Sequence, residues 1–382
     1  MAAKKQRRTK ATVEPTAWEE FAAVSRRAIS SAVKPSAKLS KKRRGRRAPK
    51  VAGTQNVAQA TTQALRLGRK QAEWVVARHR EAQQRRAKAV ESAARRRAKA
   101  GGTAEKHAAK KLAAKGGGGA ASGGAGIGGA GSRGVLVAEG DSWFDYPFYD
   151  VLEKLDDEFG WDIENVAHRG DSVESMAYDG GQLDDFVRAI QRVVRRGDVP
   201  HAILMSGGGN DIAGDGFAML LNHRSSPVFG FNPAVLDGVI QTRIRVAYTT
   251  VLSAVTAACQ GLLGAPVPIL LHGYDYPVAD GRGYLGGWGP LPGPWLEPGF
   301  RTKGYDDLAE RVAITRDLID RMYAMLDDVV ALPAFAHVQV VDLRNALSTD
   351  LVNSRYKVWW GNELHPTEPG FTKVAGLFDA QL

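Results

Sequence analysis

Four residues in the C-terminal two thirds of the chain have the types and the order that acyl chemistry requires. Ser142 follows an apolar run in "VLVAEGDSWFDYP", Gly170 lies in "HRGDS", Asn210 in "SGGGND" and His365 in "GNELHPTEPGF". A serine hydroxyl becomes a nucleophile when a neighbouring base removes its proton, and histidine suits that work because it titrates near neutrality. We therefore predict that Ser142 is a nucleophile and that His365 is its general base.

The oxygen that becomes negative when serine attacks a carbonyl needs hydrogen-bond donors placed in advance. The backbone N–H groups of Ser142 and Gly170 and the side-chain amide of Asn210 could supply three such donors. Glycine at position 170 would let the backbone come close without a Cβ in the way. Structural roles are the alternatives to these catalytic ones. Asn210 could cap a helix, and we expect Asp141 to stabilise a turn rather than act as an acid.

The elements that must position these residues alternate along the chain. Candidate strands are residues 134–139, 162–167, 201–206, 267–273 and 337–343, and candidate helices lie near 147–159, 181–196, 234–260, 305–330 and 367–380. Apolar strands separated by helices indicate a parallel sheet that is covered on both faces. Reactive groups in such sheets lie outside the carboxyl ends of the strands, which is where the serine, glycine and asparagine fall.

In this order, the blocks "GDSWF", "HRGDS", "GGGND" and "ELHP" resemble those of the SGNH (GDSL-like) hydrolases, over residues 134–382. The resemblance implies an α/β fold, a flavodoxin-like three-layer α/β/α sandwich with a parallel five-stranded sheet. It implies hydrolysis of small-molecule or lipid esters or thioesters. It assigns Ser142 as nucleophile, Gly170 and Asn210 as oxyanion donors and His365 as base. The G-x-S-x-G elbow of α/β-hydrolases occurs nowhere in the chain.

One position departs from the family pattern. The family usually has Asp three residues before the histidine, and this chain has Asn362. An amide oxygen can accept the imidazole N–H but brings no charge, and a flipped amide would hold the wrong tautomer. Either Ser142 and His365 work as a dyad oriented by Asn362, or another acceptor orients the ring. Glu363, which strand-like alternation would point away, and a backbone carbonyl are the other candidates.

A long segment, residues 274–300, follows the fourth candidate strand and is dense in Gly, Pro, Trp and Tyr. Long loops at the catalytic edge of a sheet are more often functional than incidental. We interpret it as a lid or as a wall of the acyl or alcohol pocket, with an ordered surface excursion as the alternative. The candidate pocket residues are Trp143, Tyr284, Trp288 and Trp295.

Charge is distributed very unevenly. Residues 1–133 hold 33 Lys+Arg and 7 Asp+Glu, and the rest of the chain holds 19 and 34 of the totals of 52 and 41. We divide the chain into a basic, partly helical and otherwise disordered low-complexity extension (1–115), a Gly-rich linker (116–133) and the hydrolase-like domain (134–382). The extension could bind nucleic acid or anionic membrane weakly through counterion release. The G-x-G-x-x-G at 126–131 lacks the preceding strand that dinucleotide binding needs.

The remaining features exclude some classes of protein. The chain has a single cysteine, Cys259, and therefore no internal disulfide. No metal-ligand spacing and no cofactor motif is present, so we expect neither a metal nor a cofactor. No signal peptide or long apolar span is recognisable, and we expect a cytoplasmic protein. Two alternatives to ester hydrolysis stay open: acyl transfer at the same site, and a polyanion-binding protein whose hydrolase domain is degenerate.

Overall fold

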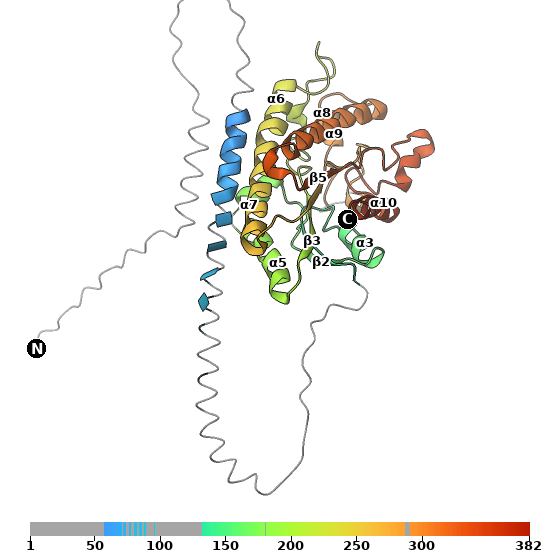
Figure 1. The fold of residues 1–382 in the computed structure, drawn as a ribbon. Coiled ribbons are helices and arrows are strands. Elements are labelled where there is room, and N and C mark those ends of the chain that lie inside the picture. The colour runs from blue at the N-terminus through green and yellow to red at the C-terminus, as the bar shows by residue number, and fades with distance from the viewer. Residues whose placement is uncertain are drawn as a thin grey trace, which may run out of the picture. The chain divides into compact units, whose positions relative to one another are not determined.

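The structure, a computed structural model, describes residues 57–70, scattered positions between 72 and 95, and residues 132–382 except 180 and 287–290. Its centre is a parallel sheet with the strand order β2-β1-β3-β4-β5 (Figure 1). The strands are β1 (Val135–Glu139), β2 (Asp162–Asn165), β3 (Pro200–Ser206), β4 (Ile269–His272) and β5 (Val338–Val341). All five agree with the predicted strands, and the order is the flavodoxin-like one, so the predicted fold class is confirmed.

Helices cover both faces of the sheet (Figure 1). They are α3 (Val151–Asp157), α4 (Val173–Tyr178), α5 (Gln182–Arg196), α6 (Pro233–Asp237), α7 (Arg245–Leu263), α8 (Glu297–Thr302), α9 (Leu308–Val330) and α10 (Glu368–Asp379). Helices α3 and α10 pack together on one face, and α4, α5 and α7 pack together on the other. The short helices α4 and α8 were not predicted from the sequence.

The strands contribute side chains to two separate hydrophobic cores, because successive side chains along a strand point to opposite faces of the sheet. In β1, Leu136 and Ala138 join the core under α3 and α10, whereas Val137 joins the core under α5 and α7. In β3, Leu204 and Ile203 divide in the same way. The inner strands β1, β3 and β4 are thus buried on both sides, which explains why they read as mainly apolar runs, whereas the edge strand β2 has no fully buried residue.

The helix predicted near 234–260 is interrupted. A π-helical turn, Gly238–Ile244, separates α6 from α7. The whole stretch Pro233–Leu263 is the one helical segment, among the described residues, with the length and apolar composition of a membrane span. More than half of its most apolar window is buried inside the molecule, as in the core helix of a folded domain. Cys259 lies in its buried face.

Part of the basic extension packs against the same helix. Residues 57–70 are helical, and the small residues Ala64, Gly68 and Ala72 recur at the four-residue spacing that places them on one face. A Cβ on Gly68 would lie 2.4 Å from the Thr250 carbonyl oxygen, so only glycine fits this approach to α7. Ser253 Oγ of α7 donates to the Leu65 carbonyl at 2.8 Å. Residues 1–56 of the extension and the 126–131 glycine motif lie outside the described residues.

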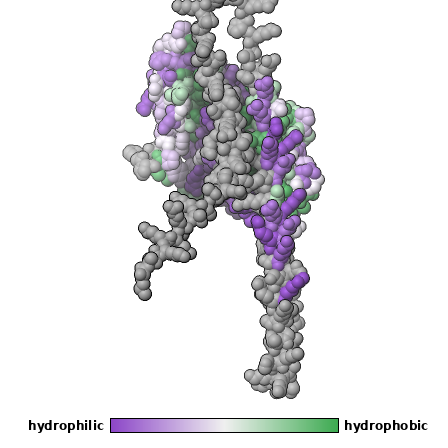
Figure 2. Space-filling view, turned by 90° about the vertical axis from the view of Figure 1, so that its left-hand side faces the viewer, coloured by the Kyte–Doolittle hydropathy of each residue, from purple (hydrophilic) through white to green (hydrophobic). Residues whose placement is uncertain are grey.

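The opposite face of this helix is exposed and mainly basic. Arg66, Arg69, Lys70 and Arg80 are exposed, with Glu73 among them. Figure 2 shows hydrophilic side chains gathered on this side of the molecule. The amphipathic division explains how the segment packs: Ala64 and Gly68 allow close contact, Leu65 and Val76 pack against the core, and the long charged side chains stay in water.

Candidate active site

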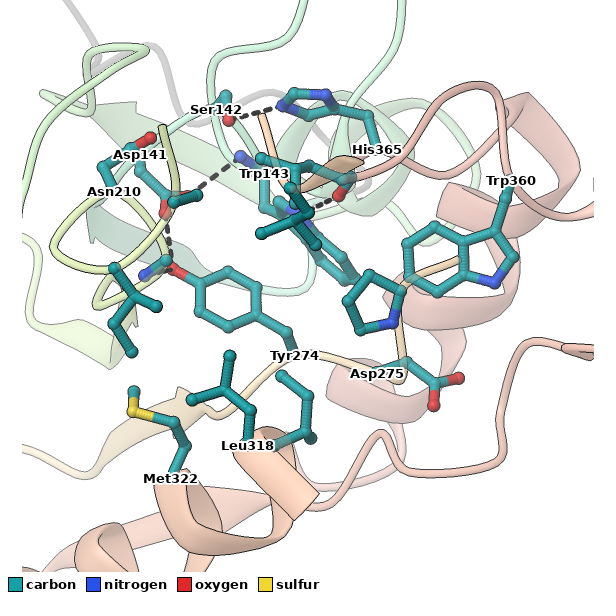
Figure 3. Close-up of a pocket in the computed structure, with 17 residues that line it drawn as sticks. Asp141, Ser142, Trp143, Asn210, Tyr274, Asp275, Leu318, Met322, Trp360 and His365 are labelled. Carbon is teal, nitrogen blue, oxygen red and sulfur yellow. Dashed lines mark hydrogen bonds between the residues drawn. The ribbon is translucent and has the colours of Figure 1, made fainter. Parts of the chain in front are cut away.

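Ser142 lies in a tight turn directly after β1. The backbone carbonyl of Asp141 accepts from Phe144 N and Asp145 N at 3.0 and 3.1 Å, and the Asp141 carboxylate accepts from Trp143 N at 3.0 Å. Gly140 precedes the turn, and a Cβ there would lie 2.8 Å from the Cβ of Ser206. The turn therefore holds Ser142 at the carboxyl end of the strand, where it lines a pocket (Figure 3).

The structure brings Ser142 and His365 together although 223 positions separate them in sequence. Ser142 Oγ lies 2.7 Å from His365 Nε2 (Figure 3). On the other side of the ring, His365 Nδ1 lies 3.0 Å from Asn362 Oδ1. Asn362 thus occupies the orienting position, and neither Glu363 nor a backbone carbonyl does. These distances suit transfer of the serine proton to Nε2.

The amide of Asn362 has a fixed orientation. Its Oδ1 also accepts from the backbone N–H groups of Leu364 and His365, at 3.0 and 2.9 Å, and its Nδ2 donates to the Tyr146 hydroxyl at 3.0 Å. A flipped amide would turn its NH₂ group toward these two backbone N–H groups, so that donors would face donors and two hydrogen bonds would be lost. Because Oδ1 faces Nδ1, that imidazole nitrogen carries the proton and Nε2 is free to accept from Ser142.

The imidazole is enclosed by aromatic rings. Tyr146 stacks on His365 with ring centroids 4.3 Å apart, and the Trp295 ring meets it edge to face at 5.4 Å. Burial lowers the pKa of His365 to about 3, because a charged imidazolium is poorly solvated here. The ring is therefore neutral at physiological pH, which is the state a general base requires.

Asn210 follows β3 and lines the same pocket as Ser142 and His365. Its Nδ2 donates to the Asp171 carbonyl at 2.9 Å, which directs the amide group. The next residue, Asp211, accepts from Val173 N at 2.8 Å at the start of α4. The loops after β2 and β3 are thereby joined, and Asp211 rather than Asn210 accepts from the first N–H groups of α4, whose N-cap residue is Ser172.

Gly170 lies in the loop after β2, beside Asp171, but it is not among the residues that line the pocket. Its φ is +90°, and a Cβ built there would meet nothing within 4 Å. The left-handed backbone of Gly170 is by itself a reason for glycine at this position.

A buried polar network behind Ser142 was not predicted. Tyr274 donates to Asp141 Oδ2 at 2.5 Å and accepts from Gly209 N at 3.0 Å, and Ser206 donates to Asp141 Oδ1 at 2.7 Å. His272 accepts from Tyr274 N through Nδ1 at 3.1 Å, so its Nε2–H points at Ser206 Oγ, 2.9 Å away. Hydrogen bonds thus tie the ends of β1, β3 and β4 together beneath the serine.

The donors in this network leave Asp141 only acceptor roles. Its two oxygens receive hydrogen bonds from Trp143 N, Ser206 and Tyr274, as an ionised carboxylate does. Burial raises the pKa of Asp141, and the three donors oppose that rise. Burial also lowers the pKa of His272 to about 3, so this histidine stays neutral.

The pocket beside Ser142 is small and mostly apolar. Its volume is about 60 Å³, and helix α9 supplies much of its wall through Leu318, Ile319 and Met322 (Figure 3). The other apolar lining residues are Trp143, Ile212, Ala213, Pro277, Leu296, Trp360 and Leu364. Sequence reasoning missed the aliphatic wall, because apolar positions on a helix look the same whether they face a core or a cavity.

Of the four aromatic residues expected in the pocket, one lines it. Trp143 does so while its Nε1 donates to the Leu364 carbonyl at 3.0 Å. Trp295 lies against His365, and Tyr284 meets the Tyr146 ring edge to face at 5.7 Å, one ring further from the serine. Trp288 lies outside the described residues. Within the described part of the chain, no cluster of three or more His, Cys, Asp or Glu has a metal-binding arrangement.

Comparisons with known proteins give matches among solved structures only. No protein-family model and no curated protein matches the chain. A candidate GDSL-like lipase from Parabacteroides merdae ATCC 43184 has a TM-score of 0.35 at 13% identity, covering 65% of this chain and 95% of its own. LAE5, an alpha/beta hydrolase from the metagenome of Lake Arreo, has a TM-score of 0.34 at 16% identity, covering 65% and 94%.

The acetylxylan esterase Axe2 from Geobacillus stearothermophilus has a TM-score of 0.31 at 16% identity, covering 66% of this chain and 94% of its own. Similarity at this level does not assign an activity to the chain. The function proposed below therefore rests on the geometry of the site.

Proposed function

We propose that the protein is an SGNH-type serine hydrolase that cleaves carboxylic esters or thioesters. The observation that carries the proposal is the contact of Ser142 Oγ with His365 Nε2 at 2.7 Å, with Asn362 fixing the tautomer of the ring. A neutral, buried imidazole with a free Nε2 beside a strand-end serine is the arrangement that activates a hydroxyl nucleophile.

The reaction follows from these contacts. Ser142 Oγ attacks the carbonyl carbon of the ester while its proton passes to His365 Nε2. The tetrahedral intermediate collapses, the bond from carbon to the leaving oxygen or sulfur breaks, and the imidazolium gives its proton to the leaving group. Water then attacks the acyl-enzyme with His365 again as base, which releases the acid and restores Ser142. An alcohol in place of water would give acyl transfer instead.

The developing oxyanion would be stabilised by the Ser142 N–H and the Asn210 amide, with the Gly170 N–H as the third donor. One such donor typically contributes about 3–4 kcal/mol to transition-state stabilisation. Asn210 is pre-directed by its bond to the Asp171 carbonyl, so little reorganisation is needed when charge develops.

The dimensions of the pocket favour a short acyl group. A cavity of about 60 Å³ with largely apolar walls has room for a few carbon atoms. We expect acetyl and butyryl esters to be better substrates than long-chain ones.

The tests are covalent labelling of one sample with a fluorophosphonate probe and hydrolysis of p-nitrophenyl acetate by a second, unlabelled sample. The wild-type protein should be labelled at Ser142 and should turn over the ester. Ser142→Ala should do neither. A wild-type protein that is folded, unlabelled and inactive toward esters and thioesters would leave the polyanion-binding alternative in place.

A further inference from the structure

The segment 274–300 is attached to the loop that carries Asn362 and His365 through one buried side chain, Glu363. This side chain has no exposed surface. Its Oε1 accepts from Gly281 N at 2.9 Å and Glu297 N at 3.0 Å, and its Oε2 accepts from Trp295 N at 2.7 Å and Leu296 N at 2.8 Å. Four backbone donors on one carboxylate satisfy it fully without any cationic partner.

These donors lie at two places in the segment, near its start and near its end. One carboxylate therefore holds both places against the catalytic loop. Further hydrogen bonds support this attachment: Glu363 N donates to the Arg282 carbonyl at 3.1 Å, and Arg282 Nη1 donates to the carbonyls of Trp360 and Gly361, both at 2.9 Å. The contacts are with backbone atoms, so they fix the course of the chain and not only side chains.

Two of the residues held in this way reach the site itself. The Trp295 ring lies edge to face on the His365 ring at 5.4 Å, and Leu296 lines the pocket beside Ser142. Leu296 is 2% exposed, and its backbone N–H is one of the four donors. The position of this part of the pocket wall thus depends directly on the Glu363 carboxylate.

We propose that Glu363 is a positioning residue that holds the end of segment 274–300 as a fixed wall of the acyl pocket, and so sets which acyl-chain lengths the enzyme accepts. The inference rests on the ester hydrolase function proposed above. It separates the roles of two neighbouring residues: Asn362 orients the base, and Glu363 fixes the pocket wall.

A change of charge at this position tests the role. In Glu363→Gln one acceptor oxygen becomes an NH₂ group that faces two backbone donors, so the wall is expected to move away from the loop. One methylene of room in an apolar pocket typically changes selectivity about tenfold or more. We therefore expect the ratio of kcat/KM for p-nitrophenyl octanoate to that for the acetate to rise about tenfold. Glu363→Asp, which keeps the charge but is shorter, should give a smaller rise.

The matched control is Glu368→Gln. Glu368 is exposed in the first turn of α10 and pairs with Lys154 at 2.8 Å, away from segment 274–300. This variant should keep the wild-type ratio. If Glu363→Gln does not fold, Arg282→Ala removes the supporting contacts to Trp360 and Gly361 and should raise the ratio in the same direction.

The outcomes separate the two proposals. An unlabelled, inactive wild-type protein would reject the hydrolase function. A labelled and active wild-type protein with folded Glu363 variants, or a folded Arg282→Ala, whose octanoate-to-acetate ratios stay within twofold of the wild-type value would reject the role of Glu363.

Discussion

The nucleophile and the base of the proposed catalytic pair are supported by different chemistry. Behind Ser142 lies a buried carboxylate, Asp141, with three donors that join the ends of three strands. Behind His365 lies the neutral amide of Asn362, with two backbone donors and the Tyr146 hydroxyl. The formal negative charge therefore lies on the serine side, and none lies against the imidazole.

In the proposed mechanism, this difference separates orientation of the histidine base from stabilisation of its charge. Asn362 supplies the orientation, because its amide is held in one direction and fixes the tautomer. It supplies no charge, so nothing offsets the effect of burial on the imidazolium, and the pKa of His365 stays low at about 3. The carboxylate on the serine side instead stabilises the geometry of the two turns that present Ser142 and Asn210.

The largest expected effect comes from removing either reacting group. Ser142→Ala or His365→Ala should lower kcat/KM for p-nitrophenyl acetate by at least about 10⁴-fold, since groups that act as a unit fail together. Both variants should stay folded, as judged by circular dichroism and thermal unfolding. Near-wild-type turnover by Ser142→Ala would contradict the role of Ser142 as nucleophile, on which the comparison of the serine side with the histidine side rests.

Tyr274→Phe tests the support on the serine side. It leaves the Gly209 N–H and one oxygen of Asp141 without their partner, at a cost of about 1–3 kcal/mol. Because Gly209 adjoins Asn210, we expect kcat to fall about 10- to 100-fold with KM little changed.

The matched control for that variant is Tyr276→Phe, since the Tyr276 hydroxyl donates to Asp320 and not to the network. Its kcat should stay within a few fold of the wild-type value. Equal losses in the two variants would mean that the network has no special connection with catalysis.

Asn362→Asp tests the support on the histidine side. The base acts in its neutral form, so the acidic limb of the kcat/KM profile lies at the pKa of His365, which burial lowers to about 3. A carboxylate against Nδ1 favours the imidazolium and should move that limb to higher pH.

The same change should raise kcat/KM at pH 8 several-fold, because it stabilises the imidazolium that forms in the transition state. Asn362→Ala should cost less than His365→Ala. The measurement is the kcat/KM profile of all these variants on one chromogenic ester. Superimposable profiles for wild type and Asn362→Asp would show that charge at this position is irrelevant.

The last test concerns stability rather than rate. Burial, with the nearby charge of Asp171, raises the pKa of Glu139 on β1 to about 9. This carboxyl ionises near pH 4.5 in the unfolded chain, so raising the pH from 5 to 8 favours unfolding. The Tm of the wild-type protein should therefore fall more over this range than that of Glu139→Gln.

The difference between the two Tm curves isolates Glu139, because the buried neutral histidines contribute equally to both proteins. Parallel curves for wild type and Glu139→Gln would contradict the raised pKa.

The sequence predicts the strands well, because a strand buried on both faces is a continuous apolar run between turn residues, as Val135–Glu139 is. It also predicts that Ser142 and Asn210 lie at one edge of the sheet, since parallel strands place their carboxyl ends there, whereas His365 comes from the loop before α10. The contact of Asn362 with His365 is one of three alternatives that the sequence leaves open, beside Glu363 and a backbone carbonyl.

The support for the serine could not be predicted in the same way. Ser206 and His272 are register partners in β3 and β4, and Tyr274 lies two residues further on. Nothing in these separate residues indicates that they meet at Asp141, because that depends on strand register and not on local spacing. The attachment of Glu363 to segment 274–300 depends on tertiary folding too, since its partners are backbone N–H groups that carry no residue signature.

The single cysteine gives the protein a practical property. Cys259 is buried in α7, and burial raises the pKa of its thiol to about 12, so almost no reactive thiolate is present at neutral pH. A maleimide dye would therefore react with a cysteine introduced at exposed Arg69 and leave the native thiol unmodified. Combined with a fluorescent phosphonate at Ser142, this would place two dyes at known positions without first removing any native residue, and energy transfer between them would report how closely the docked helix stays with the domain.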